Sequence, residues 1–304
     1  MRANRVRMLE LLAPAKINVT LEILARRDDG YHTLRSVMLP IGLYDRIVLE
    51  ESEVAQFAVG AGDASLALDN LVARALAACG ASRPYAVTLE KRVPVGGGLG
   101  GGSSDAAAVI EAAMAGRIVV DGSRDWLAIA RGLGSDVTFF LAGTGALVEG
   151  VGERVTPIGA LPPWWCVVVR PHAAVPTGPA YRALDDARAS LPQPSRPRSE
   201  SASLRAVDAL QRADLAALQD ALVNDFHDVV LRAYPPVARA HAAFVAAGAP
   251  HAMLSGSGSC LFAIFGDEPM SRRVAEAIDP AAYDFLAVVP FYQSGRWRAS
   301  GSPQ

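Results

Sequence analysis

A run of glycines between Pro94 and Ser104 is the strongest chemical signal in the amino-acid sequence. The segment reads PVGGGLGGGSS, so six glycines surround Leu99 and leave a stretch of backbone almost without side chains. Bare N–H groups can wrap around an anion, and a helix that begins after the loop adds unpaired amides and a favourable dipole. The alanine-rich run Ala106 to Ala115 has the helix propensity for this role. The segment therefore predicts a binding site for a phosphate chain.

The glycine run also resembles three other kinds of segment. Gly96, Gly98 and Gly101 have the spacing of a dinucleotide-binding loop, with Asp121 about 20 residues further on. Two charged residues and a proline directly before the glycines disfavour this hydride-transfer interpretation, because such a loop follows its strand immediately. A Walker loop is excluded, since Gly-Lys-Ser and Gly-Lys-Thr are absent. A flexible linker is disfavoured because linkers rarely join a strand to an alanine-rich helix.

Three polar residues could carry chemistry beside such an anion site. Lys16 lies in an otherwise apolar, strand-like segment, and Asn18 shares its face through the two-residue period of a strand. Asp136 precedes the apolar run Val137 to Leu141, which would hold its carboxylate at the edge of a core. From the pattern alone, an exposed lysine on a strand and an aspartate in a helix cap or turn are the commoner explanations. Both explanations stay open at this point.

A second turn rich in glycine and serine, Ser255 to Ser259, offers another backbone nest for an anion. A plain tight turn before a strand remains the alternative. The cysteines are three in number and far apart, which indicates neither a disulfide framework nor a zinc site. We assign no metal to protein side chains, because the histidines outside the N-terminal region lack ligand spacing: His172, His227, His241 and His251.

The elements that must position these residues alternate between strands and helices. Strands are expected at the N-terminus up to Ile23, over 36–51 with breaks at Pro40 and Gly42, and over 85–91, 165–169 and 260–265. Helices are expected over 69–78, 106–115 and 125–131. Helices should also dominate the region that follows residue 203, up to about Gly248. The Pro- and Ser-rich segment 187–203 predicts a mobile loop. The pattern predicts an α+β protein of two domains, residues 1–157 and 158–304.

Composition excludes several classes of function. The chain has 304 residues, 51% hydrophobic residues and a formal net charge of −2, so neither disorder nor a general nucleic-acid partner is expected. No apolar stretch approaches the ~18–20 residues that a membrane span needs. The arginines near the N-terminus precede an apolar piece that is too short for a signal peptide. These features predict a cytoplasmic protein without membrane partners, acting as a monomer or homodimer.

Five motifs in a fixed order make the chain resemble the GHMP kinases, whose ATP loop has the form Pro-x-x-x-Gly-Leu-Gly-Ser-Ser and lacks the Walker lysine. The motifs are APAKIN from Ala13 with DGYH from Asp29, the loop PVGGGLGGGSSDAA, LGSDV from Leu133, EGVGE from Glu149, and LSGSGSC from Leu254. They span nearly the full chain. The resemblance implies a two-domain kinase that binds ATP and Mg²⁺, with the active site in the cleft between the domains.

The resemblance also implies roles for individual residues. Asp136 corresponds to the catalytic base and Lys16 to the active-site lysine, and Mg²⁺ would bridge the ATP phosphates and touch Ser103 or Ser104. We also expect nucleotide contacts from Asn70 and Lys91. The loop residues that would bind ATP are Pro94, Val95, Gly96, Gly97, Gly98, Leu99, Gly100, Gly101, Gly102, Ser103 and Ser104.

Within the family, the chain is most similar to members whose small-molecule acceptor carries a cytidine diphosphate group. Tyr31 and Tyr181 would sandwich the pyrimidine and His32 would meet its hydrogen-bonding edge. The other residues implied in acceptor binding are Asn18, Thr177, Ser255, Gly256, Ser257 and Gly258. A GHMP kinase for a smaller acceptor, such as homoserine or mevalonate, remains the alternative, followed by a dinucleotide oxidoreductase and a phosphate-binding module without catalysis.

Overall fold

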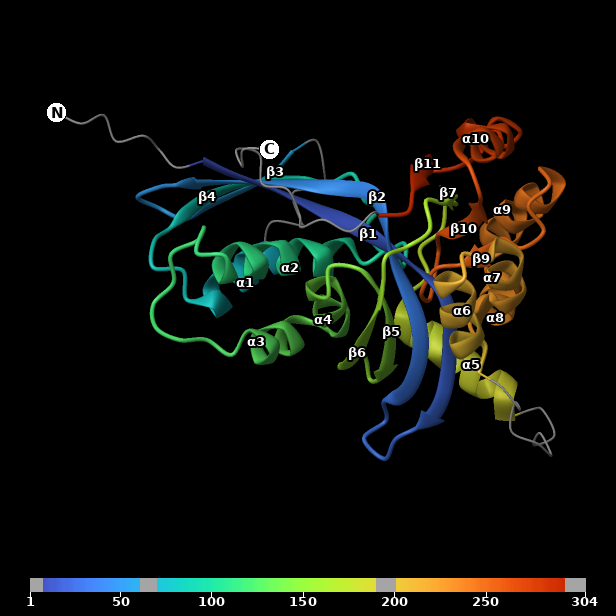
Figure 1. The fold of residues 1–304 in the computed structure, drawn as a ribbon, viewed down its shortest axis with the longest axis horizontal. Helices are drawn as coiled ribbons and strands as arrows, with labels where there is room; N and C mark the ends of the chain where they lie inside the picture. The colour runs from blue at the N-terminus through green and yellow to red at the C-terminus, as the bar shows by residue number, and fades with distance from the viewer. Residues whose placement is uncertain (1–7, 61–69, 190–200, 293–304) are drawn as a thin grey trace.

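The computed structural model describes residues 8–60, 70–189 and 201–292. Within these ranges the chain forms two β-sheets with helices packed against them (Figure 1). The mixture of strands and helices confirms the α+β class. No helix in the described ranges is long and apolar enough to cross a membrane.

A long antiparallel hairpin of β1 (Met8–Arg26) and β2 (His32–Glu51) runs through the molecule (Figure 1). Strand β1 contributes to all three hydrophobic cores, with Leu11 in the first, Ile17 in the second and Ile23 in the third. Close packing on successive layers leaves such a strand little freedom to move. A functional group in the middle of β1 is therefore held in a fixed position.

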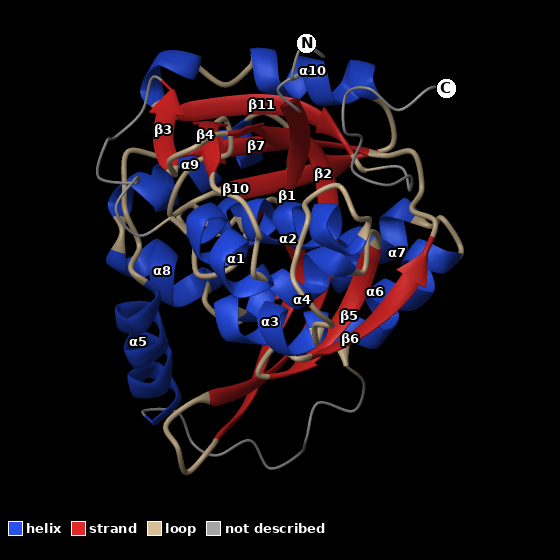
Figure 2. Ribbon diagram, turned by 90° about the vertical axis from the view of Figure 1, so that its left-hand side faces the viewer, coloured by secondary structure: helices blue, strands red, loops and turns tan. Residues whose placement is uncertain are grey.

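The first sheet contains seven strands within the described residues and has the order β3-β4-β2-β1-β8, with β5 paired to β2 and β6 to β5. Its further strands are β3 (Gln56–Gly60), β4 (Tyr85–Glu90), β5 (Gly145–Gly150), β6 (Arg154–Gly159) and β8 (Val223–Asn224). Helices α1 to α4 contribute residues to the first core together with this sheet, and Figure 2 shows them gathered beside one another. These helices are α1 (Leu71–Cys79), α2 (Gly101–Met114), α3 (Trp126–Leu133) and α4 (Ser135–Leu141).

The second sheet has the order β11-β7-β10-β9 and lies beside helices α9 and α10 (Figure 1). Its strands are β7 (Trp165–Arg170), β9 (Met253–Leu254), β10 (Leu261–Phe265) and β11 (Phe285–Pro290). The helices of this half are α5 (Thr177–Ala189), α6 (Ala202–Gln211), α7 (Leu215–Ala221), α8 (His227–Ala233), α9 (Pro235–Ala246) and α10 (Glu268–Glu276), with a short 3₁₀ helix η2 (Pro280–Ala282). Buried residues of both halves meet in the second core, which joins the sheets.

Two sequence-based boundaries are wrong for local reasons. Strand β2 continues through Pro40 and Gly42 without ending, although its pairing with β1 shifts close to the expected break. Pro14 pairs with Tyr44 and Ala15 with Ile41, so that Gly42 and Leu43 of β2 have no partner on β1. Helix α2 begins at Gly101, five residues before the expected start, because its first turn is made by the glycines of the loop.

The prediction of a mobile loop over 187–203 is wrong at both ends of the segment, because α5 continues to Ala189 and α6 begins at Ala202. Its centre, 190–200, lies outside the described residues. The division at residues 157/158 falls within β6 and stays a prediction.

Candidate active site

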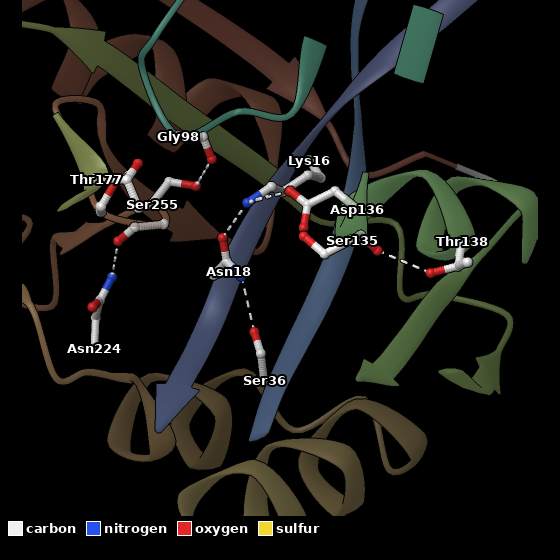
Figure 3. Close-up of polar contacts among 12 residues, drawn as sticks. Lys16, Asn18, Ser36, Gly98, Ser135, Asp136, Thr138, Thr177, Asn224 and Ser255 are labelled. Carbon is white, nitrogen blue, oxygen red and sulfur yellow. Dashed lines mark hydrogen bonds and ion pairs between the residues drawn. The ribbon is translucent and has the colours of Figure 1, made fainter. Parts of the chain in front are cut away.

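Lys16 lies in the middle of β1, and Figure 3 shows its ammonium group directed at both Asn18 and Asp136. Its Nζ donates to Asn18 Oδ1 at 2.5 Å and lies 3.5 Å from Asp136 Oδ2. Only 3% of Lys16 is exposed, and a buried ammonium needs such partners because an unpaired charge away from water is costly. The interpretation of Lys16 as an exposed lysine is therefore wrong. The structure brings the three predicted residues together, while their catalytic roles stay a prediction.

Asn18 is oriented by hydroxyl groups behind it. Its Nδ2 donates to Ser36 Oγ at 2.9 Å (Figure 3). Ser36 Oγ in turn donates to the backbone carbonyl of Thr20 at 2.6 Å. Because the amide nitrogen is used by Ser36, the amide oxygen faces Lys16. The sequence reasoning did not find Ser36, and a lone serine in an apolar strand gives no signal beyond its period-two position.

Asp136 lies in the first turn of α4 and leaves 27% of its side chain exposed. Gly134 occupies the N-cap position, and in the described part of the chain no side chain caps this helix, so Asp136 is not a capping residue. Thr138 Oγ1 donates to the carbonyls of Ser135 at 2.9 Å and Gly152 at 3.1 Å, which ties the first turn of α4 to the turn after β5. A carboxylate held beside an ammonium and open on its other side can accept a proton from a hydroxyl group.

The glycine loop lines a cavity of about 400 Å³ at the N-terminus of α2. Gly96, Gly98 and Gly100 have φ values of 72°, 78° and 71°, a left-handed conformation that favours glycine. The first turn of the 14-residue helix α2 contributes unpaired amides and its dipole to the same cavity. A cradle of backbone without side chains fits the phosphates of ATP.

The predicted nucleotide residues line this cavity with one exception. Asn70 and Lys91 lie at its wall together with the loop from Pro94 to Ser103. Ser104 is buried behind the cavity, and its Oγ has no hydrogen-bond partner among the described residues. Of the two serines, Ser103 is therefore the one whose hydroxyl can meet a Mg²⁺ ion carried by ATP. Within the described ranges, no group of three His, Cys, Asp or Glu side chains could hold a metal ion by itself.

The second glycine-serine turn packs directly on the first. Ser255 Oγ donates to the carbonyl of Gly98 at 3.0 Å, and the backbone N–H of Cys260 donates to the carbonyl of Gly97 at 3.1 Å. A Cβ on Gly98 would lie 2.0 Å from the carbonyl oxygen of Ser255. A Cβ on Gly256 would lie 3.6 Å from Lys16 Nζ. The turn 255–259 is thus part of the site and not only a connection between strands.

Asn224, at the end of β8, holds this second turn in place. Its Nδ2 donates to the carbonyls of Leu254 at 2.7 Å and Gly256 at 2.8 Å, and its Oδ1 accepts from the backbone N–H of Phe226 at 2.9 Å. Figure 3 shows Asn224 below Ser255. The sequence reasoning did not assign Asn224 to the site, because its two partners lie about 30 residues further along the chain.

A larger cavity of about 960 Å³ adjoins the other side of the Lys16–Asp136 pair through Ser135 and Thr177. The ring of His32 stacks on that of Tyr181, with centroids 4.9 Å apart and an interplanar angle of 25°. Burial, followed by the nearby Asp136 charge, raises the pKa of Tyr181. His32 thus covers one face of Tyr181, and the pyrimidine sandwich between Tyr31 and Tyr181 stays a prediction.

The remaining side chains of the larger cavity set its polarity. Tyr31 is 69% exposed at the edge, and His32 Nε2 lies 2.9 Å from Asp185 Oδ1. Thr177 Oγ1 lies 3.1 Å from Ser257 Oγ, so the second turn reaches this cavity as well. Arg131 and Arg182 line the cavity and have no ion-pair partner among the described residues. The cavity therefore combines aromatic rings with unpaired positive charge.

Comparison with known proteins defines the class of this fold and site. The N-terminal domain of the GHMP kinases matches residues 66–144, and their C-terminal domain matches residues 206–284. Homoserine kinase from Cytophaga hutchinsonii superimposes with a TM-score of 0.69 over 97% of this chain and 97% of its own, at 18% identity. At that identity the likeness concerns the fold alone. The fold and the glycine loop are those of an ATP-dependent small-molecule kinase of the GHMP class.

More similar proteins narrow the class to one family. The 4-diphosphocytidyl-2-C-methyl-D-erythritol kinase of Symbiobacterium thermophilum is 41% identical over 92% of this chain and 99% of its own length. The protein of that name from Thermus thermophilus is 38% identical over 89% of this chain and 92% of its own. A crystal structure of 4-(cytidine 5'-diphospho)-2C-methyl-D-erythritol kinase has a TM-score of 0.74 at 36% identity, covering 92% of this chain and 99% of that chain. The chain belongs to the 4-diphosphocytidyl-2-C-methyl-D-erythritol kinase family.

Proposed function

We propose that the chain transfers the γ-phosphoryl group of ATP to the 2-hydroxyl of 4-diphosphocytidyl-2-C-methyl-D-erythritol, giving the 2-phosphate. This reaction belongs to the non-mevalonate route to isoprenoid precursors. Relatives that match most of this chain are named as kinases of this acceptor, which supports the choice of acceptor. The alternative acceptors, homoserine and mevalonate, belong to proteins that resemble this chain at 15% to 18% identity.

The observation that carries the proposal is the position of the Lys16–Asp136 pair between two cavities. On one side, the backbone N–H of Lys16 bonds to Leu99 of the glycine loop at 2.9 Å. On the other side, Ser135 lines the cavity that also holds His32 and Tyr181. A phosphoryl donor on the loop and an acceptor against the aromatic rings would thus meet at the pair. Such positioning supplies much of the rate enhancement of a kinase.

The residues at the junction have separate tasks. Asp136 accepts the proton of the attacking hydroxyl, because its carboxylate is partly exposed and its charge acts on Tyr181 of the acceptor cavity. Lys16 stabilises negative charge on the attacking oxygen and holds Asp136 in register, while Asn18 fixes the Lys16 ammonium. Ser103 would contact Mg²⁺ bound with ATP, and the ion would neutralise negative charge on the phosphates. Chelation of Mg²⁺ should therefore abolish turnover. Independently of the metal, we expect the active form to be a monomer or homodimer.

The acceptor cavity suits a cytidine joined to a diphosphate. Tyr31 can cover a pyrimidine at the exposed edge, while His32 offers a nitrogen already oriented by Asp185. The guanidinium groups of Arg131 and Arg182 provide charge for phosphate oxygens in the same cavity. Homoserine and mevalonate have neither an aromatic base nor a diphosphate, so they would leave these groups unused.

The decisive experiment measures ADP release from Mg-ATP with 4-diphosphocytidyl-2-C-methyl-D-erythritol, homoserine and mevalonate in parallel. We expect turnover with the cytidyl acceptor alone, and loss of that turnover in Asp136→Asn. Turnover with another acceptor would keep the kinase class and remove the cytidine site. ATP binding without turnover of any acceptor would favour a phosphate-binding module, and nicotinamide binding without a need for Mg²⁺ would favour an oxidoreductase.

A further inference from the structure

Lysine is rare in this chain, and both lysines lie at the proposed ATP site. Lys16 and Lys91 are the only two among 29 basic residues, and arginine occupies every other basic position. Lys16 lies at the centre of the site, whereas the role of Lys91 is not explained by the phosphoryl transfer. An ammonium is a compact charge with three donors and cannot be replaced by the planar fork of a guanidinium where space is short.

Lys91 bridges two buried carboxylates directly after β4. Its Nζ donates to Asp45 Oδ2 of β2 and, at 2.9 Å, to Asp105 Oδ2 of α2. The side chains are 12% exposed in Lys91, 0% in Asp45 and 2% in Asp105. Both hydrogen bonds that the Lys91 ammonium makes to described residues go to these two carboxylates. Lys91 therefore has its charge directed into the protein, although its side chain lies at the wall of the cavity.

The partners of Lys91 hold opposite ends of the glycine loop. Asp45 Oδ1 accepts from the backbone N–H groups of Arg92 at 2.6 Å and Val93 at 2.9 Å, the two residues directly before the loop. Asp105 lies in the first part of α2, directly after the loop. The chain from Arg92 to Asp105 is thus closed into a loop whose ends meet at one ammonium group.

The start of α2 packs closely on this ion cluster. A Cβ added to Gly101 would lie 3.1 Å from Asp45 Oδ2 and 3.1 Å from Lys91 Nζ. The glycine at 101 therefore lets the first turn of the helix approach the charged groups. A change in the separation of Asp45 and Lys91 would be transmitted directly to the amides that line the phosphate cavity.

We propose that Asp45, Lys91 and Asp105 form a buried clamp that fixes the two ends of the glycine loop, so that Lys91 is a positioning residue and makes no contact with the nucleotide. The clamp rests on the proposed binding of ATP at this loop. Without the ammonium, two carboxylates would remain buried side by side and repel each other. The loop would then lose the spacing that matches the phosphates, while Lys16 and Asp136 stay in place.

The test uses charge removal in two steps. Lys91→Met should raise the KM for ATP about tenfold or more, a loss on the scale of 1.4 kcal/mol or above, with a smaller effect on kcat and on the KM for the acceptor. Adding Asp105→Asn to Lys91→Met removes one of the two repelling charges and should recover most of the ATP affinity. If Lys91 bound the nucleotide itself, the second substitution could not restore the lost contact, and an unrecovered double variant overturns the clamp.

Arg83→Met is the matched control. Arg83 is separated from the start of β4 by Pro84, leaves 61% of its side chain exposed and pairs with Glu51 away from the loop. The substitution Arg83→Met removes one positive charge near the other end of β4 and leaves Asp45, Lys91 and Asp105 unchanged. The KM for ATP should therefore stay within about twofold of the unsubstituted protein. Thermal unfolding of each variant separates loss of the fold from loss of binding.

A measurement on the unsubstituted chain keeps the test independent of folding. Because the chain has two lysines, protein labelled with ¹³C at the lysine ε-carbon gives one signal for Lys16 and one for Lys91. Addition of the non-hydrolysable analogue AMPPNP should shift the Lys16 signal and leave that of Lys91 nearly unchanged. A Lys91 shift as large as that of Lys16 overturns the clamp. Absence of any binding of AMPPNP would instead contradict the proposed kinase function.

Discussion

The carbonyl oxygen of Gly98 accepts a hydrogen bond from Ser255 Oγ at 3.0 Å, across 157 residues of sequence. The two glycine-rich turns therefore form one surface, made by the loop before α2 and the turn between β9 and β10. Neither turn can move without the other, because a Cβ on Gly98 would already collide with the backbone of Ser255 at 2.0 Å. The nucleotide cradle is thus built from both halves of the chain.

Substitution of Gly98 by alanine should reduce ATP affinity. The φ of 78° strains any side chain at this position, at a cost of about 1–2 kcal/mol, and the new Cβ would in addition push Ser255 away. Gly96→Ala is the control, since its φ of 72° carries the same strain while no atom of the described part of the chain lies within 4 Å of the added atom. Titration with ATP should show clearly weaker binding for Gly98→Ala than for Gly96→Ala, and equal affinities would contradict the contact between the turns.

Asn224→Ala should weaken the same surface from behind. The two carbonyls of Leu254 and Gly256 would lose their donor, and unsatisfied buried groups cost about 1–3 kcal/mol each at most. We expect a lower melting temperature together with a raised KM for ATP. Gln219→Ala, which removes a donor from the carbonyl of Ile264 far from the loop, should lower stability alone. A normal KM in Asn224→Ala would exclude a role of this residue in the site.

Asp136→Asn should lower kcat about 10²–10⁴-fold, because an amide cannot accept the hydroxyl proton. Its size is unchanged and its neighbour Lys16 keeps Asn18 as a partner, so ATP binding should persist. Steady-state kinetics with both substrates, combined with an ATP titration, distinguish these effects. A parallel loss of ATP affinity would show that the carboxylate positions Lys16 and the loop, and would remove the assignment as a base.

Tyr31→Ala should raise the KM of the cytidyl acceptor and leave the KM of ATP unchanged. Tyr31 is 69% exposed, so the substitution removes an aromatic face for the base with little effect on stability. Arg182→Gln should act on the same KM through the diphosphate, and inhibition by cytidine, CMP and CDP separates the two effects. Tyr31→Ala should weaken all three inhibitors, whereas Arg182→Gln should weaken CDP most and cytidine least. An acceptor KM equal to that of the unsubstituted protein would remove Tyr31 from the site.

The sequence predicted the parts of the site that depend on local pattern. Period two placed Lys16 and Asn18 on one face of β1, and the bare loop before an alanine-rich helix predicted the anion cradle. Contacts between distant segments could not be predicted this way. Ser36, Asn224 and Asp45 act through partners on other elements, and their own neighbours in sequence carry no sign of it. The bond between His32 and Asp185 likewise joins residues 153 positions apart.

The fold shows the same division between local and distant information. The helix expected over 125–131 is found as α3, and Asp125 caps it at the residue before its start, because a helix start depends only on the residues that follow it directly. The prediction that a loop begins at Ala187 is wrong. The polar helix α5 continues beyond this residue, and its buried residues Ala180 and Leu184 pack in the third core. Tertiary packing thus stabilised a segment whose composition favoured a loop.

Asp105→Asn should change how stability depends on pH. Burial, opposed by Lys91 and supported by the charge of Asp45, raises the pKa of Asp105 to about 7. An unfolded aspartate has a pKa of about 3.9, so the folded chain binds the additional proton between these values. The contribution of Asp105 to stability is therefore present at low pH and is lost as the pH rises toward 7 and above.

In the asparagine variant this loss is absent, so the free energy of unfolding should improve relative to the unsubstituted protein as the pH rises from about 5 to 8. Urea denaturation of both proteins at these two pH values measures the difference. Lys91, whose pKa is raised, stays charged over the whole range and contributes no slope. If the two proteins showed the same dependence on pH, Asp105 would already be ionised in the folded chain at pH 5. Lys91 would then balance the charges of both carboxylates over the whole range.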